Sequence, residues 1–243
     1  MNEIAWNVKE TAATRARYDR IAPLYDFVEA LVERYRFSDW RERAWSLVAG
    51  PRVLEVGVGT GKNVPYYPPG VHVTGVDLSA RMLTRARKRT AHREPPVTLL
   101  QMDAQALDFP DDAFDSGIAT FVFCSVPDPI LGLREMARVV KPGGQIVLLE
   151  HVRSESPLLG RLMDWLDPLV AWLMGPHISR RTVENVRRAG LTIERVKDLD
   201  TGGIVKLIVS HPRQMAGVEM GQIPLVTARP LVVRWGSVPW HID

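Results

Sequence analysis

The stretch Val53-Leu54-Glu55-Val56-Gly57-Val58-Gly59-Thr60-Gly61 organises this chain of 243 residues. Its apolar and β-branched start predicts a buried strand, and the alternate glycines predict a tight turn before a helix. Glycine lets the backbone adopt positive φ and lets a ligand approach closely, while the free N–H groups at a helix start attract anions. Because Lys62 stands where a dinucleotide fingerprint has its third glycine, a pyrophosphate cofactor is disfavoured.

Two carboxylates follow the next two predicted strands. The strand over 71–76 leads to Asp77, twenty residues after Gly57, where a carboxylate can accept hydrogen bonds from both hydroxyls of a ribose. Asp103 follows the strand over 97–101 and can receive an adenine amino group. Since the carboxyl ends of parallel strands meet at one edge of a sheet, the three features together predict a nucleoside site.

The composition fits one large α/β core with appendages, because 46% of the residues are hydrophobic and 24% are charged. The net charge of +3 comes from scattered basic residues, so it gives no reason to expect nucleic acid as a partner. The single cysteine, Cys124, excludes an internal disulfide and fits a reducing compartment. The first ten residues lack a signal-peptide core and no long apolar run is free of charge, so a cytoplasmic protein without a spanning helix is expected.

The sequence resembles the class I S-adenosylmethionine-dependent methyltransferases over residues 15–210. The similarity is carried, in the family's order, by Glu55-Val-Gly-Val-Gly-Thr-Gly61, Asp77, Asp103-Ala104 and Lys141-Pro-Gly-Gly144. It implies an α/β fold, namely a Rossmann-like, doubly wound, seven-stranded sheet that is mostly parallel and ends in an antiparallel hairpin strand. The methyltransferase domain is expected over 49–210. Strands are expected over 53–56, 71–76, 97–101, 116–123, 145–150, 191–196 and 204–209.

The resemblance also implies S-adenosyl-L-methionine as the cofactor. Gly57, Gly59 and Gly61 would admit the methionine portion, Asp77 would hold the ribose and Asp103 the adenine. The family pattern adds five further cofactor-binding residues: Tyr18, Glu55, Leu78, Ala104 and Phe121. No residue is assigned to a metal.

Residues 1–48 precede the first strand and are expected to form a helical lid. Ile21, Tyr25 and Val28 recur at steps of three and four residues, so one side packs. The stretch Tyr18-Asp-Arg-Ile-Ala-Pro-Leu-Tyr25-Asp26 is similar to the Y-D-x-x-A-x-x-Y-D segment of methyltransferases that act on quinones and phospholipids. Pro23 is expected at a helix start. An ordinary helix that only covers the sheet is the alternative.

The exits of the fourth and fifth strands offer candidates for the chemistry. Cys124-Ser-Val-Pro-Asp-Pro129 departs from the pattern of DNA amino-methyltransferases, an Asn or Asp before Pro-Pro and an aromatic, so a nucleic-acid base is a poor substrate. Cys124 has no identifiable activating partner and is assigned to packing. His151 could accept a proton near neutral pH, with Tyr25 orienting the acceptor, and we assign both as catalytic. The alternative for His151 is a surface residue that caps a turn.

The segment 157–174 is the most apolar of the chain. Arg161, Asp164 and Asp167 interrupt it and Pro168 breaks it, so it predicts two short helices rather than a membrane span. This insertion, 157–175, could line an apolar pocket, touch a bilayer or simply pack over the sheet. Near the N-terminus, several arginines and two tryptophans could attract anionic lipid: Arg15, Arg17, Arg20, Arg34, Arg36, Arg41, Arg43, Trp40 and Trp45.

The remaining segments predict local structure only. A helix over 130–140 should stop at Lys141-Pro-Gly-Gly144, and Ser179 should cap a helix that Gly190 ends. Four prolines exclude a long helix from residues 211–243, which are expected to form an extended tail. That tail would cover this molecule or a neighbour in a homo-oligomer.

Taken together, these features predict a methyltransferase with a hydrophobic or amphiphilic acceptor. The Tyr18–Asp26 segment, the Glu150-His-Val-Arg153 exit and the apolar insertion are most similar to bacterial phosphatidylethanolamine N-methyltransferases, so a phospholipid amine headgroup is preferred. A quinone or phenol, and an alkyl thiol or another small molecule, are the alternative acceptors. A lipid acceptor implies peripheral contact with an anionic membrane at its inner face. A nucleoside-binding regulatory module is the rival of another class.

Overall fold

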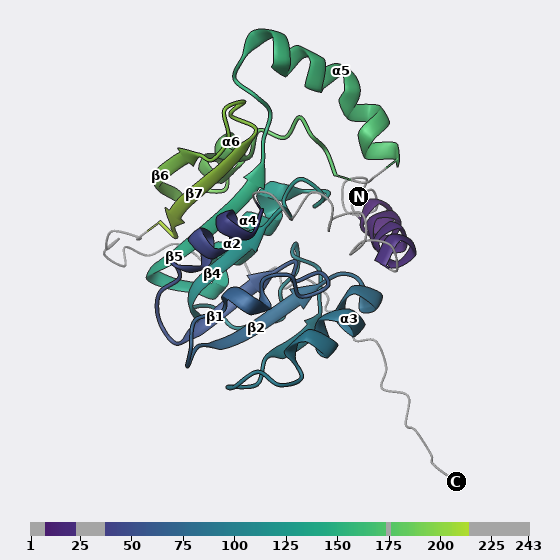
Figure 1. Cartoon of the computed structure of the whole chain (residues 1–243). Helices are drawn as coiled ribbons and strands as arrows, with labels where there is room; N and C mark the ends of the chain where they lie inside the picture. The colour runs from purple at the N-terminus through teal and green to yellow at the C-terminus, as the bar shows by residue number, and fades with distance from the viewer. Residues whose placement is uncertain (1–7, 23–36, 174–175, 214–243) are drawn as a thin grey trace, which may run out of the picture.

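Seven strands form one sheet in the computed structural model, which describes residues 8–22, 37–173 and 176–213. The strands are β1 Arg52–Val56, β2 His72–Asp77, β3 Thr98–Gln101, β4 Phe114–Thr120, β5 Val140–His151, β6 Thr192–Asp198 and β7 Val205–His211. Their order is β3-β2-β1-β4-β5-β7-β6, and only β7 runs antiparallel to its neighbours β5 and β6. The predicted α/β fold, a doubly wound sheet closed by an antiparallel hairpin, is confirmed (Figure 1).

Helices cover both faces of this sheet (Figure 1). They are α2 Phe37–Trp45, the 3-10 helix η1 Val64–Tyr66, α3 Ala80–Thr90, α4 Pro129–Val139, α5 Pro157–Leu173 and α6 Thr182–Arg188, and residues 8–22 are also helical. Side-chain caps fix two of the starts: Ser79 accepts a hydrogen bond from Met82 N, and Asp128 accepts from two N–H groups of α4.

The hydrophobic core lies in two layers because successive strand residues face opposite sides of the sheet. Leu54 packs in the layer that contains α4 and α6, whereas its neighbour Val53 packs in the layer that contains α2. Trp45 of α2 is fully buried in that second layer. The prediction that Trp45 anchors the protein in lipid is therefore wrong, and Arg41, which is also buried, cannot supply surface charge.

Three predicted helices differ from the structure. The turn after Gly61 leads only to η1, so this site lacks the long helix start that would attract an anion. Residues 157–173 form one helix with Pro168 inside it, because much of α5 is exposed and water can hydrate the carbonyl that proline frees. Ser179 caps no helix: its N–H donates to Asp167, and α6 begins at Thr182.

The segment Lys141–Gly144 lies inside β5 instead of forming a separate stop after α4. The pairing of β4 with β5 is irregular between Phe114 and Ser116, so the extra residues are absorbed as a bulge in the sheet. The predicted boundary between helix and loop thus becomes a boundary between helix and strand.

Several expected features lie outside the described residues, namely Tyr25, Pro23, the remainder of the segment 23–36 and the tail 214–243. Within the part of the chain that the structure describes, no helix has both the length and the hydrophobicity needed to cross a bilayer.

Candidate active site

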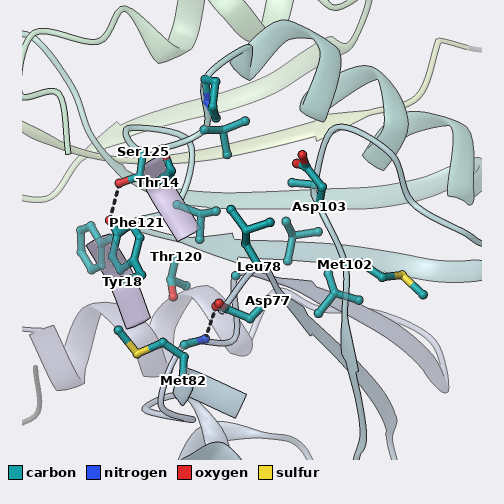
Figure 2. Close-up of a pocket in the computed structure, with 18 residues that line it drawn as sticks. Thr14, Tyr18, Asp77, Leu78, Met82, Met102, Asp103, Thr120, Phe121 and Ser125 are labelled. Atoms are coloured by element: carbon teal, nitrogen blue, oxygen red, sulfur yellow. Dashed lines mark hydrogen bonds between the residues drawn. The ribbon is translucent and has the colours of Figure 1, made fainter. Parts of the chain in front are cut away.

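A cleft opens at the carboxyl ends of β1, β2 and β4, where the glycine turn meets the helix over 8–22 (Figure 2). It is lined by residues of β1, β2 and β4, by the loops that follow β2, β3 and β4, and by Thr14 and Tyr18 of the helix over 8–22.

Gly57 and Gly59 line this cleft with positive φ of 70° and 56°. A Cβ on Gly57 would lie 2.3 Å from a methyl group of Val122, so only glycine fits there. Gly61 is not among the described lining residues. Its φ is 84°, and a Cβ there would lie 3.2 Å from Ala86 Cα, so Gly61 lets the turn pack on α3.

Asp77 lies at the middle of the cleft, at the end of β2 (Figure 2). Its carboxylate accepts hydrogen bonds from Gly59 N and from Ser79 N, both at 2.8 Å. Burial raises the pKa of Asp77 to about 6, although these two bonds favour the charged form. Two carboxylate oxygens have about four acceptor sites, so the bonds leave capacity for the hydroxyls of a ribose. Leu78, which the sequence also assigns to the cofactor, lines the same part of the cleft.

Asp103 and Ala104 line the cleft beside Met102, at the end of β3 (Figure 2). The Asp103 carboxylate accepts hydrogen bonds from Gln105 N at 2.9 Å and from Gln105 Nε2 at 3.0 Å. It also accepts from Thr11 Oγ1 at 3.3 Å, which ties this loop to the helix over 8–22. The predicted order along the cleft, glycines then Asp77 then Asp103, is therefore present.

The helix over 8–22 closes one side of the cleft with Thr14 and Tyr18. The Tyr18 hydroxyl and Ser125 Oγ lie 2.6 Å apart in a hydrogen bond (Figure 2). Asp19 of the same helix accepts from Ser79 Oγ at 2.5 Å. Burial raises the pKa of Tyr18, so its hydroxyl stays neutral. Together with the Thr11 contact, these hydrogen bonds join the helix to the loops after β2, β3 and β4, each of which contributes lining residues.

Glu55 is not among the described lining residues and lies in a buried polar network below the cleft. It accepts hydrogen bonds from Asn63 Nδ2 at 2.5 Å and from the Tyr67 hydroxyl. Arg41 donates to Asn63 Oδ1 at 2.9 Å and to Thr120 Oγ1 at 3.0 Å, and Thr120 lines the cleft. Burial raises the pKa of Glu55 to about 7. Glu55 thus supports the cleft from behind.

His151 is not among the described lining residues of the cleft, but its ring packs against the ring of Phe121, which is. Its imidazole centroid is 4.6 Å from that of Phe121, which lines the cleft at a positive φ of 59°, and 5.9 Å from that of Phe37. The Arg41 guanidinium lies 5.4 Å from the Phe121 centroid. Burial lowers the pKa of His151, so the ring is neutral at pH 7 and able to accept a proton.

Glu150 positions the loop after β4, which lines the cleft, and the sequence analysis assigned it no such role. It is fully buried, and its Oε1 accepts hydrogen bonds from Val122 N at 2.9 Å and Phe123 N at 3.0 Å, which fixes the loop after β4. Among the described residues its Oε2 has no partner, and burial raises the pKa of Glu150 to about 7. The feature of the sequence that could have indicated this role is a single acidic residue, Glu150, at the end of an otherwise apolar strand. In the same loop, Cys124 is buried, and burial raises the pKa of its thiol to about 12, which favours packing over nucleophilic chemistry.

Comparison with known proteins agrees with this geometry. Residues 54–148 match the family of methyltransferase domains. A phosphatidylethanolamine N-methyltransferase from Cereibacter sphaeroides is 44% identical over 153 residues, which are 61% of this chain and 73% of that protein. The chain belongs to the S-adenosylmethionine-dependent methyltransferases. A demethylmenaquinone methyltransferase from Clavibacter sepedonicus is 35% identical over 64% of this methyltransferase and 65% of its own length.

Solved structures show the same fold. A methyltransferase from Thermotoga maritima, described as a possible histamine N-methyltransferase, has a TM-score of 0.61 and 24% identity over 79% of this chain and 98% of its own. The residues that line the cleft fit S-adenosyl-L-methionine. Gly57 has no room for a Cβ, as expected where the backbone turns tightly beside a ligand. At the centre of the cleft, backbone N–H groups hold the Asp77 carboxylate. The alternative of a binding module without enzyme activity is set aside by the family.

Proposed function

We propose that this methyltransferase acts on an amphiphilic acceptor, with the amine headgroup of a phospholipid as the first choice. One observation carries the proposal: four large apolar side chains lie exposed along α5. Leu158 is 81% exposed, Leu162 50%, Trp165 77% and Leu169 59%. Their spacing of four, three and four residues places them on one face of the helix, which we call the α5 stripe. Such a face is typical of helices that lie in a membrane interface.

The rest of α5 is attached to the domain. Met163 is buried, Asp164 forms an ion pair with Arg153 at 2.8 Å, and Asp167 accepts from His177 Nδ1 at 2.8 Å. The far end of α5 approaches the helix over 8–22, beside the cleft (Figure 1). A bilayer bound to the α5 stripe would therefore place lipid headgroups close to the cleft opening, so a lipid could enter without crossing water.

For methyl transfer to an amine, the protein has to align the amine with the methyl group and remove a proton from the amine. When bound, S-adenosyl-L-methionine supplies the activated methyl group. An attacking amine must be neutral, so a proton has to leave it. We assign this role to His151, which is neutral and partly buried, acting through a water because Phe121 lies between its ring and the cleft. Tyr18 and Phe121 would exclude bulk water, and Tyr25, outside the described residues, would orient the acceptor.

A quinone or phenol is the second candidate acceptor. The aromatic group of Phe37, Trp40, Phe121 and His151 favours a planar ring, with Phe37 and Trp40 centroids 5.2 Å apart. The similarity to a demethylmenaquinone methyltransferase supports the same choice. An alkyl thiol remains a third candidate without a structural feature of its own.

An acceptor assay separates these candidates. Wild-type protein and S-adenosyl-L-methionine with a labelled methyl group are incubated with phosphatidylethanolamine vesicles, a naphthol with an isoprenoid chain, and a long-chain thiol. We expect label in the phospholipid. Label in the naphthol or thiol with none in the phospholipid would refute the proposal. Asp77→Ala is the control, since it should reduce transfer to every acceptor alike.

A further inference from the structure

A second pocket adjoins the cofactor cleft, between the helix over 8–22, the loop after β4, the end of α5 and residues 177–180. Thr14, Ser125 and Pro127 line both the pocket and the cleft. Ser125 also holds Tyr18 by the hydrogen bond of 2.6 Å. The pocket and the cleft thus share part of their lining and lie side by side.

Two arginines, Arg17 and Arg180, line this pocket from different segments. Arg180 donates from Nη2 to Val126 O at 3.1 Å, but its buried Nε has no hydrogen-bond partner within the described part of the chain. Desolvation lowers the pKa of Arg180, which means that burial of its charge is not fully compensated. Arg17 makes no hydrogen bond or ion pair with any residue that the structure describes. Both cations could therefore donate to an anion.

The segment that carries Arg180 is held in place before any ligand arrives. His177 N donates to Cys124 O at 3.0 Å, Ser179 N donates to Asp167 at 2.9 Å, and Arg180 O accepts from Arg153 N at 2.9 Å. The imidazole of His177, another lining residue, is fixed by Asp167. Glu10 is the one acid among the described lining residues; it is exposed and lies two helical turns from Arg17. A fixed cationic pocket of this kind suits a phosphate.

We infer that this pocket binds the phosphate of the methyl acceptor, an inference that rests on the proposed phospholipid substrate. In a phosphatidylethanolamine headgroup, only one oxygen and two carbons separate the phosphorus from the amine. A phosphate site must therefore adjoin the methyl-transfer cleft, and the shared Thr14 and Ser125 meet that condition. Ala171 of α5 lines the pocket as well, so phosphate would lie at the end of the helix whose stripe faces lipid. A soluble phosphate ester of ethanolamine offers the same chemistry.

Direct binding tests the pocket without assuming an acceptor. Glycerophosphate is titrated into protein saturated with S-adenosylhomocysteine and followed by 31P NMR. Arg180→Gln and Arg17→Gln should each raise the Kd about tenfold or more, the scale of a lost charge-assisted hydrogen bond. Arg181→Gln is the matched control, because Arg181 is 67% exposed, pairs with Glu184 and is not on the lining. Equal affinity for all four proteins would overturn the inference.

Kinetics then identify the source of the phosphate. Arg180→Gln should raise KM for phosphatidylethanolamine about tenfold while KM for a long-chain primary amine without phosphate stays unchanged. Equal increases for both substrates would overturn the inference. If phosphoethanolamine is methylated as efficiently as the lipid, the pocket serves a soluble phosphate ester. If wild type methylates no phospholipid but glycerophosphate binding still depends on Arg17 and Arg180, the proposed acceptor fails and the phosphate site stands.

Folding of the variants needs its own check, because Arg180 also donates to Val126 O. Unchanged affinity for S-adenosylhomocysteine in calorimetry shows that the cleft is intact. If Arg180→Gln does not fold, the Kd of Arg17→Gln for glycerophosphate tests the inference alone, because Arg17 lies on the helix over 8–22 and forms no hydrogen bond with the described residues. Arg180→Lys keeps the charge, so it should restore part of the phosphate affinity relative to Arg180→Gln.

Discussion

Glu150→Gln should make the stability of this methyltransferase less dependent on pH. The Glu150 carboxyl is fully buried and has a pKa near 7, against 4.5 for an ordinary glutamate. Between these values the folded state binds a proton that the unfolded state has already released. Stability from this proton is therefore complete below pH 4.5 and is lost as the pH rises through 7. Glutamine imitates the protonated acid and cannot ionise.

The magnitude follows from the pKa difference. Each pH unit of difference corresponds to about 1.4 kcal/mol, so ionisation of Glu150 costs the folded state at most about 3 kcal/mol. The free energy of unfolding of Glu150→Gln minus that of wild type should rise by this amount between pH 5 and pH 8. Glutamine keeps an oxygen for Val122 N and Phe123 N, and any cost of its amide group is the same at every pH.

Urea denaturation at pH 5, 6, 7 and 8 measures this difference. Glu184→Gln is the control, because Glu184 is 53% exposed and should follow the wild-type profile. The free energy of unfolding of wild type should fall with rising pH by more than the contribution of Glu150, because burial also raises the pKa of Glu55 and of Asp77. Parallel profiles for wild type and Glu150→Gln would show that Glu150 is ionised throughout and that the reasoning is wrong.

Three further predictions concern the cofactor, the proton and the membrane. Asp77→Asn should weaken binding of S-adenosylhomocysteine by about 1–3 kcal/mol in calorimetry, the scale of a lost charged hydrogen bond, and an unchanged Kd would remove Asp77 from the site. His151→Phe keeps the ring packed on Phe121 but should lower kcat by about 10²–10⁴, as loss of a general base does, whereas near-normal turnover would make His151 a packing residue. Leu162→Ser with Trp165→Ser should reduce co-sedimentation with anionic vesicles more than tenfold, since each buried apolar side chain is worth about 1.5–3 kcal/mol. The exposed Val196→Ser on β6 is its control, and equal binding by both variants would refute the α5 stripe.

The cofactor half of the site could be predicted from the sequence because its signals are local. Glycines at positive φ and an acid at a strand end are short-range patterns, so Gly57, Gly59, Asp77 and Asp103 all line the cleft as expected. The sheet was predictable for the same reason, since each strand carries its own apolar pattern.

The support behind the cleft could not be predicted, because it is built by distant residues. Arg41 joins Asn63 and Thr120 across separations of 22 and 79 residues, and no local pattern marks such pairs. The same arginine in the sequence is indistinguishable from a surface charge. Whether an arginine is buried depends on the strands that pack around it.

Sequence similarity to known methyltransferases supports the cofactor cleft more directly than the region that would bind the acceptor. The match to the methyltransferase-domain family covers residues 54–148, which hold the glycine turn, Asp77 and Asp103 but neither the helix over 8–22 nor α5. The second pocket and the α5 stripe are built mainly by these outer segments. Similarity within 54–148 therefore supports the cofactor and leaves the acceptor open. Outside that range, Arg17, Arg180 and the α5 stripe favour an acceptor with both a phosphate and an apolar chain.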